Sequence, residues 1–382
     1  MIEIQCIEDA GELGRLAGVW NGLLQRSDSD SLFLTWEWVW TWWEVYGDRY
    51  HPLVLVARDH GEVVGIAPLM VARGAGRVTR HVRYLLFIGQ NEDVTPEYLD
   101  FFVVRGREAE VTPALCEYLI KDKGCAWEVA RFESMLDSSP NLAAIQQAFA
   151  RRGSPLRLMS QVECPYAELP DSWDAFLQSK SKHFRKRVTY NLRRIEREGE
   201  VRLHYVDRDV SLEQAYDELV RLNKERWGEE GESFRSERYL EFHRRVCRRL
   251  LPQGWLLLVL FKVADQLVAA KYDYCYASKL WGNQGGWLRE YEKKEIGNVF
   301  IGKLIEWGID RGYNEYDFLG GGDEYKKRWG DSLRMMADYE GWNDTLRSRA
   351  FRAGQQGRNW VLAQIPADWR QKVDRVRRTL GI

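Results

Sequence analysis

Apolar and polar positions in the second half of the chain follow the periods of short strands and amphipathic helices. Residues 281–330 predict a strand, a loop, a helix opened by Gly297, a strand at 316–319 and a turn of three glycines at 320–322. Upstream, apolar runs at 255–262 and 267–276 flank a polar turn and predict a β-hairpin. The remaining predicted elements are helices at 171–178, 180–198, 212–227 and 239–250 and a strand at 201–206.

The first half shows a similar order of elements. Strands are predicted at 2–7, 53–57, 63–71, 82–88, 98–104 and 126–132, and helices at 11–25, 111–121, 141–151 and directly after Thr35. Residues 53–70 and 256–274 both give strand, turn and strand, and residues 111–132 and 297–318 both give helix, turn and strand. This shared order suggests a duplicated α/β unit.

The fold class predicted from this order is α/β, with two tandem domains. The pattern lapses near residues 160–170, so we place an N-terminal domain at 1–165 and a C-terminal domain at 166–345. An Arg-rich tail at 346–382 has helical spacing at 360–363 and 369–380 and is expected to pack outside or contact a partner. A length of 382 residues fits two domains and a tail.

Composition narrows the range of partners. With 56 basic and 57 acidic residues the net charge is −1, so no global field attracts nucleic acid, and we expect no general nucleic-acid binding. The 17 tryptophans include a cluster at residues 36–43. That cluster is typical of a helix buried against a sheet; a stacking platform for a ring-bearing ligand is the alternative.

No pattern of metal or disulfide chemistry is visible. The six cysteines form no CxxC pair and the six histidines no HxxxH or HExxH motif, so we predict reduced thiols and no metal. The acidic start of the chain lacks an apolar signal core, and the longest apolar run, at 255–261, is too short to cross a bilayer. We therefore expect a cytoplasmic protein without a membrane span.

A set of short stretches resembles the GNAT acetyltransferase superfamily. The closest resemblance is to CelD-like (cellulose-biosynthesis type) acetyltransferases, which are related to Fem-type aminoacyltransferases with two GNAT-like domains. The matching stretches are KHFRKR at 182–187, LRR at 192–194, ERW at 225–227, Gly297, DFLG at 317–320, YKKRW at 325–329, FLTWEW at 33–38, WW at 42–43 and GIAPL at 65–69. Together they cover most of residues 30–330.

The resemblance implies an acyltransferase with two tandem GNAT-like domains, the C-terminal one catalytic. Each domain is then a mixed, mostly antiparallel sheet flanked by helices. Its members transfer an acyl group, most simply acetyl from acetyl-CoA, to an amine or hydroxyl of a sugar, a polysaccharide precursor or a related small molecule. The family's pyrophosphate loop, R/Q-x-x-G-x-G/A, corresponds here to REYEKKEIGN at 289–298, which has one glycine. That departure leaves an acyl carrier protein as an alternative donor. A Fem-like, tRNA-dependent aminoacyltransferase and a non-catalytic GNAT-fold interaction protein are the alternative functions, and the oligomeric state stays open.

Acyl transfer needs a positioned nucleophile, donors for the oxyanion, and a route for two protons. Asp317 ends a strand beside glycines. It is a candidate general base, and a turn-forming residue is the alternative. Tyr325 is a candidate to protonate the thiolate, and Lys326 to hold an anionic group; a core tyrosine and a solvated lysine are the alternatives. The glycine-bearing strand 280–287 is expected to splay, which exposes backbone donors, or to carry a bulge.

The remaining candidates bind the donor or the acceptor. The candidates for holding the donor are Trp287, Tyr291, Lys293, Lys294, Gly297 and Asn298, since a helix start can hold phosphates. The candidates for the acceptor are Arg226, Trp227, Asp273, Gly320, Gly321 and Glu324. Tyr291 is a second candidate acid. The basic run at 180–197 is typical of a solvated helix face, with an anionic acceptor, an acidic carrier protein or tRNA as alternative partners.

Overall fold

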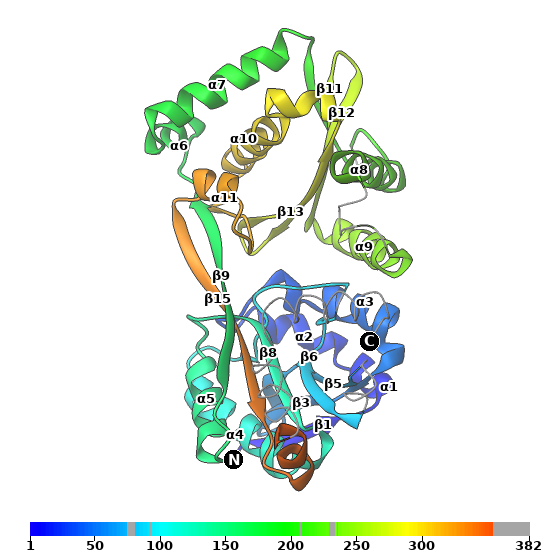
Figure 1. The fold of residues 1–382 in the computed structure, drawn as a ribbon, viewed down its shortest axis with the longest axis vertical. Coiled ribbons are helices and arrows are strands. Elements are labelled where there is room, and N and C mark those ends of the chain that lie inside the picture. The colour runs from blue at the N-terminus through cyan, green and yellow to red at the C-terminus, as the bar shows by residue number, and fades with distance from the viewer. Residues whose placement is uncertain (75–80, 92, 207, 229–233, 235, 354–382) are drawn as a thin grey trace, which may run out of the picture.

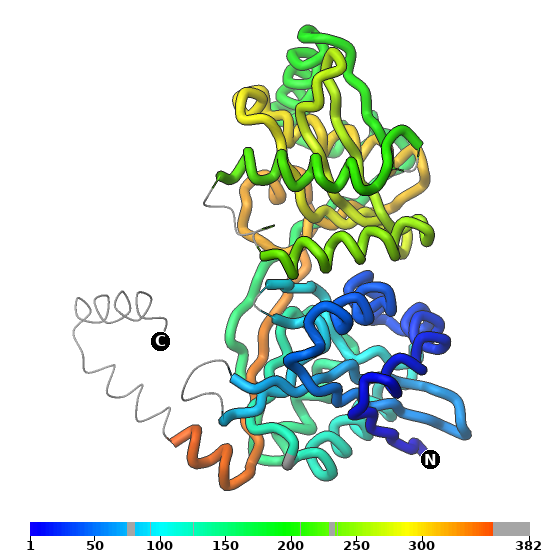
Figure 2. Tube along the Cα trace, turned by 90° about the vertical axis from the view of Figure 1, so that its right-hand side faces the viewer, coloured from blue at the N-terminus to red at the C-terminus, as the bar shows by residue number. Residues whose placement is uncertain are grey.

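The computed structural model in Figure 1 has two bodies stacked along its long axis. It describes residues 1–74, 81–91, 93–206, 208–228, 234 and 236–353. Two long antiparallel strands, β9 (Arg157–Glu168) and β15 (Ser332–Trp342), run from one body into the other, and Figure 2 shows them from the side. The bodies are therefore tied together by paired backbone.

The N-terminal body contains a small four-stranded sheet and several helices. Its strand order is β1 (Glu3–Ile7), β3 (Val54–Asp59), β4 (Glu62–Ala67) and β7 (Phe102–Val103). Its helices are α1 (Ala10–Gly14), α2 (Ala17–Leu24), α3 (Trp36–Tyr46), α4 (Glu108–Lys121) and α5 (Leu142–Arg151). The single helix predicted at 11–25 is thus two helices, and the strand predicted at 98–104 is only two residues long.

A larger mixed sheet passes through both bodies. Within the described residues its strand order is β10 (Val201–Tyr205), β11 (Leu256–Val263), β12 (Gln266–Tyr276), β13 (Lys279–Trp287), β14 (Glu315–Asp317), β9, β15, β8 (Val129–Leu136), β6 (Arg83–Phe87), β5 (Leu69–Arg73) and β2 (Tyr50–Pro52). Most neighbours are antiparallel; β13–β14 and β6–β8 are parallel. The predicted α/β class, with mixed sheets flanked by helices, is confirmed.

Helices cover both faces of the sheet in the C-terminal body. They are α6 (Trp173–Ser179), α7 (Lys182–Glu196), α8 (Leu212–Trp227), α9 (Glu237–Leu250), α10 (Ile296–Ile309) and the short α11 (Glu324–Trp329). Figure 1 shows α7 and α10 on one side of the strands and α8 and α9 on the other. The hairpin predicted around residues 264–266 is confirmed: Ala264 and Asp265 both have positive φ, as a two-residue hairpin turn requires.

One feature of the sequence prediction needs correction. Residues 160–170 are not a lapse in structure but most of β9, and the predicted domain boundary at 165/166 falls inside this strand. The first five residues of β9 are exposed, so no apolar alternation marks them, and pairing with β15 holds them extended. The division of the chain into domains stays a proposal.

The chain ends and the aromatic cluster complete the comparison. Residues 346–353 are helical, whereas the segments at 360–363 and 369–380 lie outside the described residues. In the tryptophan cluster, Trp38, Trp42 and Trp43 are buried, whereas Trp36 and Trp40 are only partly buried and stack on each other. The five cysteines whose side chains are described are free: Cys6, Cys116, Cys164, Cys247 and Cys275. Across the described part of the chain, every helix is too short or too polar to cross a membrane.

Candidate active site

The two central strands of the C-terminal body separate in the middle of the sheet. β13 pairs with β14 only at Lys279, Leu280 and Trp281. At the same place its register with β12 shifts, since Tyr274 faces Trp281 but Tyr272 faces Gln284. Gly282 and Asn283 therefore face the single residue Asp273 and form a β-bulge. Both alternatives considered for strand 280–287, a splay and a bulge, occur together.

Asp273 fixes this bulge. Its carboxylate is fully buried and accepts hydrogen bonds from the Asn283 backbone N–H at 2.9 Å, Lys271 Nζ at 2.6 Å and the Tyr316 hydroxyl at 2.6 Å. A buried carboxylate with three donors is stable only while all three stay in place. Asp273 lines neither of the pockets described below, so its observed contacts are structural.

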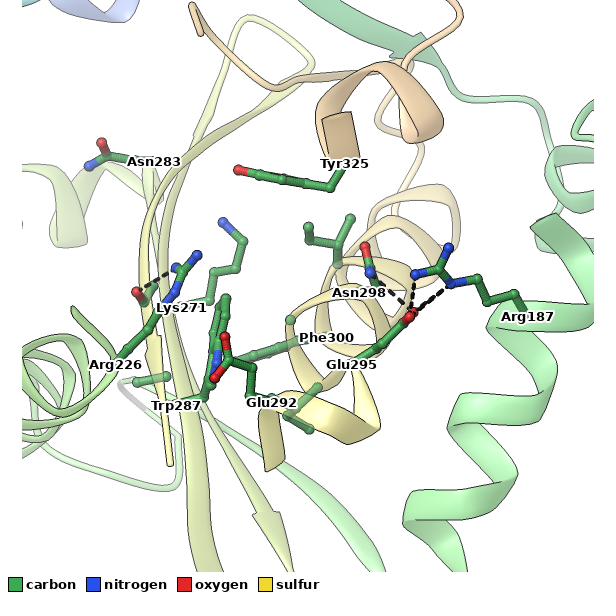
Figure 3. Close-up of a pocket in the computed structure, with 15 residues that line it drawn as sticks. Arg187, Arg226, Lys271, Asn283, Trp287, Glu292, Glu295, Asn298, Phe300 and Tyr325 are labelled. Atoms are coloured by element: carbon green, nitrogen blue, oxygen red, sulfur yellow. Dashed lines mark hydrogen bonds and ion pairs between the residues drawn. The ribbon is translucent and has the colours of Figure 1, made fainter. Parts of the chain in front are cut away.

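The first pocket, here called the α10 pocket, lies between β13 and the start of α10 and has a volume of about 260 Å³. Figure 3 shows Arg226, Lys271 and Trp287 on one side, Arg187, Glu295 and Asn298 on the other, and Tyr325 of α11 above. The other lining residues are Ala270, Asn283, Gly285, Glu292, Ile296, Gly297, Phe300 and Ile301. The splay of the strands thus opens onto a pocket with several polar groups.

Arg226 is the most unusual charge in the α10 pocket. Its guanidinium lies over the rings of Trp287, 3.5 Å from the centroid, and Trp227, 4.1 Å from the centroid. Its hydrogen-bond acceptor is the Gly285 carbonyl at 3.3 Å, and among the described residues it has no carboxylate partner. Burial lowers its pKa to about 10, so it stays charged at neutral pH. Trp287 Nε1 is also buried without a partner among the described residues.

A carboxylate occupies the start of α10. Glu295 accepts hydrogen bonds from Arg187 Nε at 2.8 and 2.9 Å, Asn191 Nδ2 at 2.8 Å and Asn298 Nδ2 at 3.3 Å. The Arg187 hydrogen bond lowers the pKa of Glu295, which stays ionised. Gly297 is needed for packing, because a Cβ there would lie 2.9 Å from the Trp287 ring.

The second pocket, here called the interbody pocket, has a volume of about 510 Å³. The N-terminal body contributes Phe33, Trp38, Asp93, Val94, Thr95 and Glu97, and the C-terminal body Ser236, Tyr239, His243, Gly282, Asn283, Gln284, Leu319, Gly320 and Lys326. Asn283 lines both pockets, so the bulge of β13 is their common wall. On α11, Tyr325 lines the α10 pocket and the next residue, Lys326, lines the interbody pocket.

Glu97 and Lys326 meet at the glycine turn. Glu97 Oε2 accepts a hydrogen bond from Gly320 N at 2.6 Å, and Lys326 Nζ donates to the Gly320 carbonyl at 2.5 Å. Desolvation raises the pKa of Glu97 to about 7, although the Gly320 N–H and Lys326 oppose the shift. Burial lowers the pKa of Lys326. A carboxyl group that titrates near neutral pH inside a pocket is a candidate acid or base.

Asp317, the base expected from the sequence, is placed elsewhere. It is 1% exposed and accepts hydrogen bonds from the Tyr98 hydroxyl at 3.0 Å, Leu319 N at 2.8 Å and Arg334 Nη1 at 3.0 Å. Desolvation raises its pKa to about 6. It lines a third cavity, of about 130 Å³, and neither of the two pockets that meet at Asn283. These contacts join the two bodies, because Tyr98 belongs to the N-terminal one.

Some of the other residues singled out from the sequence line one of the two pockets, and the rest line neither. Trp287, Gly297, Asn298, Arg226 and Tyr325 line the α10 pocket, and Gly320 and Lys326 line the interbody pocket. Six line neither pocket: Tyr291, Lys293, Lys294, Trp227, Gly321 and Glu324. Lys294, for example, pairs with Glu198 at 2.6 Å and covers the Tyr291 ring.

The pocket residues that the sequence analysis missed include Asp93, Glu97, Arg187, Lys271, Asn283, Glu292 and Glu295. Arg187 lies within the basic run at 180–197 and Glu295 within the loop at 289–298. The sequence does not show that these two side chains bind each other. Nothing in the sequence places Glu97 next to a turn 223 residues later. No group of side chains suited to a metal ion occurs among the described residues.

Close packing of α8 on β13 positions Arg226 and gives a stability prediction. A Cβ on Gly286 would lie 2.1 Å from the backbone nitrogen of Asn223, so Gly286→Ala must push the helix away from the strand. We expect the free energy of unfolding to fall by about 1–3 kcal/mol or more. Urea unfolding measures it, with Gly22→Ala as control, since nothing lies within 4 Å of that exposed helical glycine. Equal stability of the two variants would contradict the packing.

Comparison with known proteins identifies the type of domain. Residues 182–327 match a family model described as an acetyltransferase (GNAT) domain. This part of the C-terminal body is thus similar to a GNAT domain. No curated protein matches the chain. The CelD-like assignment stays a prediction.

Solved structures show the fold of the whole chain. FemX has a TM-score of 0.60 at 13% identity, over 88% of this chain and 96% of its own. A conserved protein of unknown function from Bacteroides thetaiotaomicron has a TM-score of 0.54 at 10% identity, over 90% and 100%. L-PGS from Bacillus licheniformis has a TM-score of 0.51 at 14% identity, over 89% and 94%. At these identities the similarity shows a GNAT-like α/β fold and not a substrate.

Proposed function

We propose that this protein is an acyltransferase that moves an acyl group from a thioester in the α10 pocket to an amine in the interbody pocket. The observation that carries the proposal is that the two pockets meet at Asn283, where β14 leaves β13. Two substrates bound in pockets that meet at one residue have their reacting ends held close together. This proximity supplies much of the rate enhancement in a two-substrate transfer. A GNAT domain match over the same residues supports this reading.

The charges of the interbody pocket favour an amine over a hydroxyl acceptor. Two carboxylates, Asp93 and Glu97, face one cation, Lys326, so a protonated amine is attracted. An amine must lose a proton before it attacks, and Glu97 has a pKa of about 7, close to the working pH of a general base. The aromatic side chains of Phe33 and Trp38 provide apolar surface for the rest of a small acceptor, such as an amino sugar.

Each step of the transfer can be given to a residue of this chain. Glu97 takes the proton of the attacking amine. Lys326, held by the Gly320 carbonyl, places a positive charge beside the reacting centre and stabilises the developing oxyanion. Burial raises the pKa of Tyr325 to about 12, so its hydroxyl is protonated at neutral pH and can donate a proton to the departing thiolate. A thioester supplies the activated carbonyl and that thiolate.

The test uses a minimal donor. We expect release of free thiol from acetyl-pantetheine to depend on an added amine, with amino sugars in the first panel of acceptors. Tyr325→Phe should lower kcat by about tenfold, since a general acid typically contributes at least that much. Tyr118→Phe, outside both pockets, is the matched control and should behave like the wild type.

Other outcomes distinguish the remaining functions. Transfer from charged tRNA in place of thioesters would replace the proposal by aminoacyl transfer. Absence of turnover and of heat stabilisation with every thioester and tRNA would favour an interaction protein, because a ligand of the native state must stabilise it.

A further inference from the structure

We propose that the thioester donor arrives on an acyl carrier protein that docks on the basic face of α7, and that CoA is a poor donor. This inference rests on the proposed function, in which the α10 pocket holds a thioester. It is carried by two independent features: the charge at the start of α10, and an unneutralised basic groove on the neighbouring helix.

The start of α10 does not suit the diphosphate of CoA. Glu292 and Glu295 both line this end of the pocket, and Arg187, the nearest cation, is already bound to Glu295 by two nitrogens. The space above Gly297 is filled by the Trp287 ring, so the glycine does not open the backbone to a phosphate. Lys294 pairs with Glu198 instead of facing the pocket. A dianionic group would meet two carboxylates where the fold family provides backbone donors.

The exposed side of α7 has the opposite character. Its basic face consists of Arg185, Lys186, Thr189, Tyr190, Arg193 and Arg197, which line an open groove of about 350 Å³. Their spacing of three and four residues puts them on one side of the helix. Among the described residues, none of the four cations has a carboxylate partner. Arg185 donates to the carbonyls of Gln178 and Lys180.

This arrangement is unusual for the molecule. Several basic residues on other exposed helices are paired with acids, as Arg221 with Glu218 on α8 and Arg245 with Glu241 on α9. The whole chain has a net charge of −1, so the basic face is not the result of a basic composition. Tyr190 lies among these cations and is 62% exposed, which gives the surface an apolar centre.

The basic face lies beside the donor pocket. Arg187, one residue after Lys186, points to the other side of α7 and lines the α10 pocket. Arg194 Nη1 donates to the Lys293 carbonyl at 3.1 Å, which ties α7 to the loop before α10. A partner docked on α7 is therefore next to the pocket entrance formed by that loop.

Carrier-protein chemistry fits both features. An acidic helical carrier presents its thioester on a phosphopantetheine arm that has one phosphodiester in place of a diphosphate. Its acidic surface complements the free cations of α7, which raises the association rate and gives specificity. A nucleic acid would also be attracted, but it would not deliver the thioester on which the proposed function depends.

The test compares three acetyl donors: an acetyl-loaded acyl carrier protein, acetyl-CoA and acetyl-pantetheine. For the wild type we expect kcat/KM with the carrier to exceed that with acetyl-CoA by about 30-fold or more, within the range of electrostatic steering. The double variant Lys186→Glu/Arg193→Glu should lose at least about tenfold with the carrier and keep its rate with acetyl-pantetheine. Arg221→Glu/Lys224→Glu, two exposed positions on α8 across the sheet, is the matched charge-reversal control and should keep both rates.

The outcomes separate this inference from the proposed function. Equal kcat/KM with acetyl-CoA and the carrier, or equal loss in both double variants, overturns the docking site. If no donor supports turnover, the proposed function fails; direct titration of the holo-carrier against wild type and the α7 variant then still decides whether α7 binds it. Salt-sensitive tRNA binding that depends on Lys186 and Arg193, without carrier binding, also contradicts the inference.

Discussion

Glu97→Gln is expected to lower kcat by about 100-fold, the effect of removing a general base, while KM changes little. The amide keeps an oxygen that can accept the Gly320 N–H, so the glycine turn stays in place and only the proton acceptor is lost. Steady-state thiol release from acetyl-pantetheine measures both constants. Glu163→Gln is the matched control, since Glu163 pairs with Lys327 outside both pockets.

The pH profile provides a second readout for Glu97. The pKa of this carboxyl group is raised to about 7 in the folded protein, so it is protonated and inactive as a base below that pH. In the wild type kcat/KM should rise about tenfold per pH unit up to this pKa and then level off. The variant should lack this limb. An unchanged limb in Glu97→Gln would assign the base to another group.

The raised pKa also has a consequence for stability. Because the folded state binds the Glu97 proton more tightly than the unfolded state, the free energy of unfolding falls as pH rises through the interval from the usual carboxyl range to about 7. Asp317, with a pKa of about 6, and Asp100, also about 6, act in the same direction. Glu97→Gln should reduce the slope of stability against pH in this interval.

Asp317→Ala is expected to lower the free energy of unfolding by about 1–3 kcal/mol, because it leaves the buried Tyr98 hydroxyl and the Leu319 N–H without their acceptor. Arg334 of β15 keeps its ion pair with Glu315, but Tyr98 of the N-terminal body loses its acceptor, so the substitution weakens the connection between the bodies. Urea unfolding at pH 7.5, where the carboxyl group is ionised, measures the loss.

A control variant and one contrary outcome test whether Asp317 is the general base that the sequence predicts. Glu163→Ala removes an exposed partner of Lys327 and should cost no more than about 1 kcal/mol. If Asp317→Asn instead kept the wild-type stability and lowered turnover at least about tenfold, the residue would act in proton transfer, as the sequence analysis expected.

Local patterns predicted most single elements of the fold. The tryptophan-rich segment 36–46 forms a helix, and its Trp42 and Trp43 are buried because only a packed interior accommodates so many large rings. The hairpin of β11 and β12 could be predicted because its turn residues stand between two apolar runs. Strands β9 and β15 could not, since the first five residues of β9 are exposed and the two strands hold each other extended.

The candidate site was predicted in part for a similar reason. Trp287, Gly297 and Tyr325 were found because glycines and aromatic residues mark the strand, the loop and the short helix that form the α10 pocket. Asp317 was selected as a carboxylate at a strand end, but its side chain accepts hydrogen bonds from Arg334 on β15 and from Tyr98, which lies 219 residues earlier in the sequence.

By itself, the sequence determined the order of helices and strands, the class of the sheet and the position of the glycine-rich strand next to a helix start, because these depend on neighbours a few residues apart. Only the tertiary structure decided that Glu97 lies on the Gly320 turn, that Glu295 is held by Arg187, and that Asn283 separates two pockets. The physical reason is distance along the chain. The pKa of a carboxyl group and the wall of a pocket depend on desolvation and charges contributed by residues that folding alone brings together.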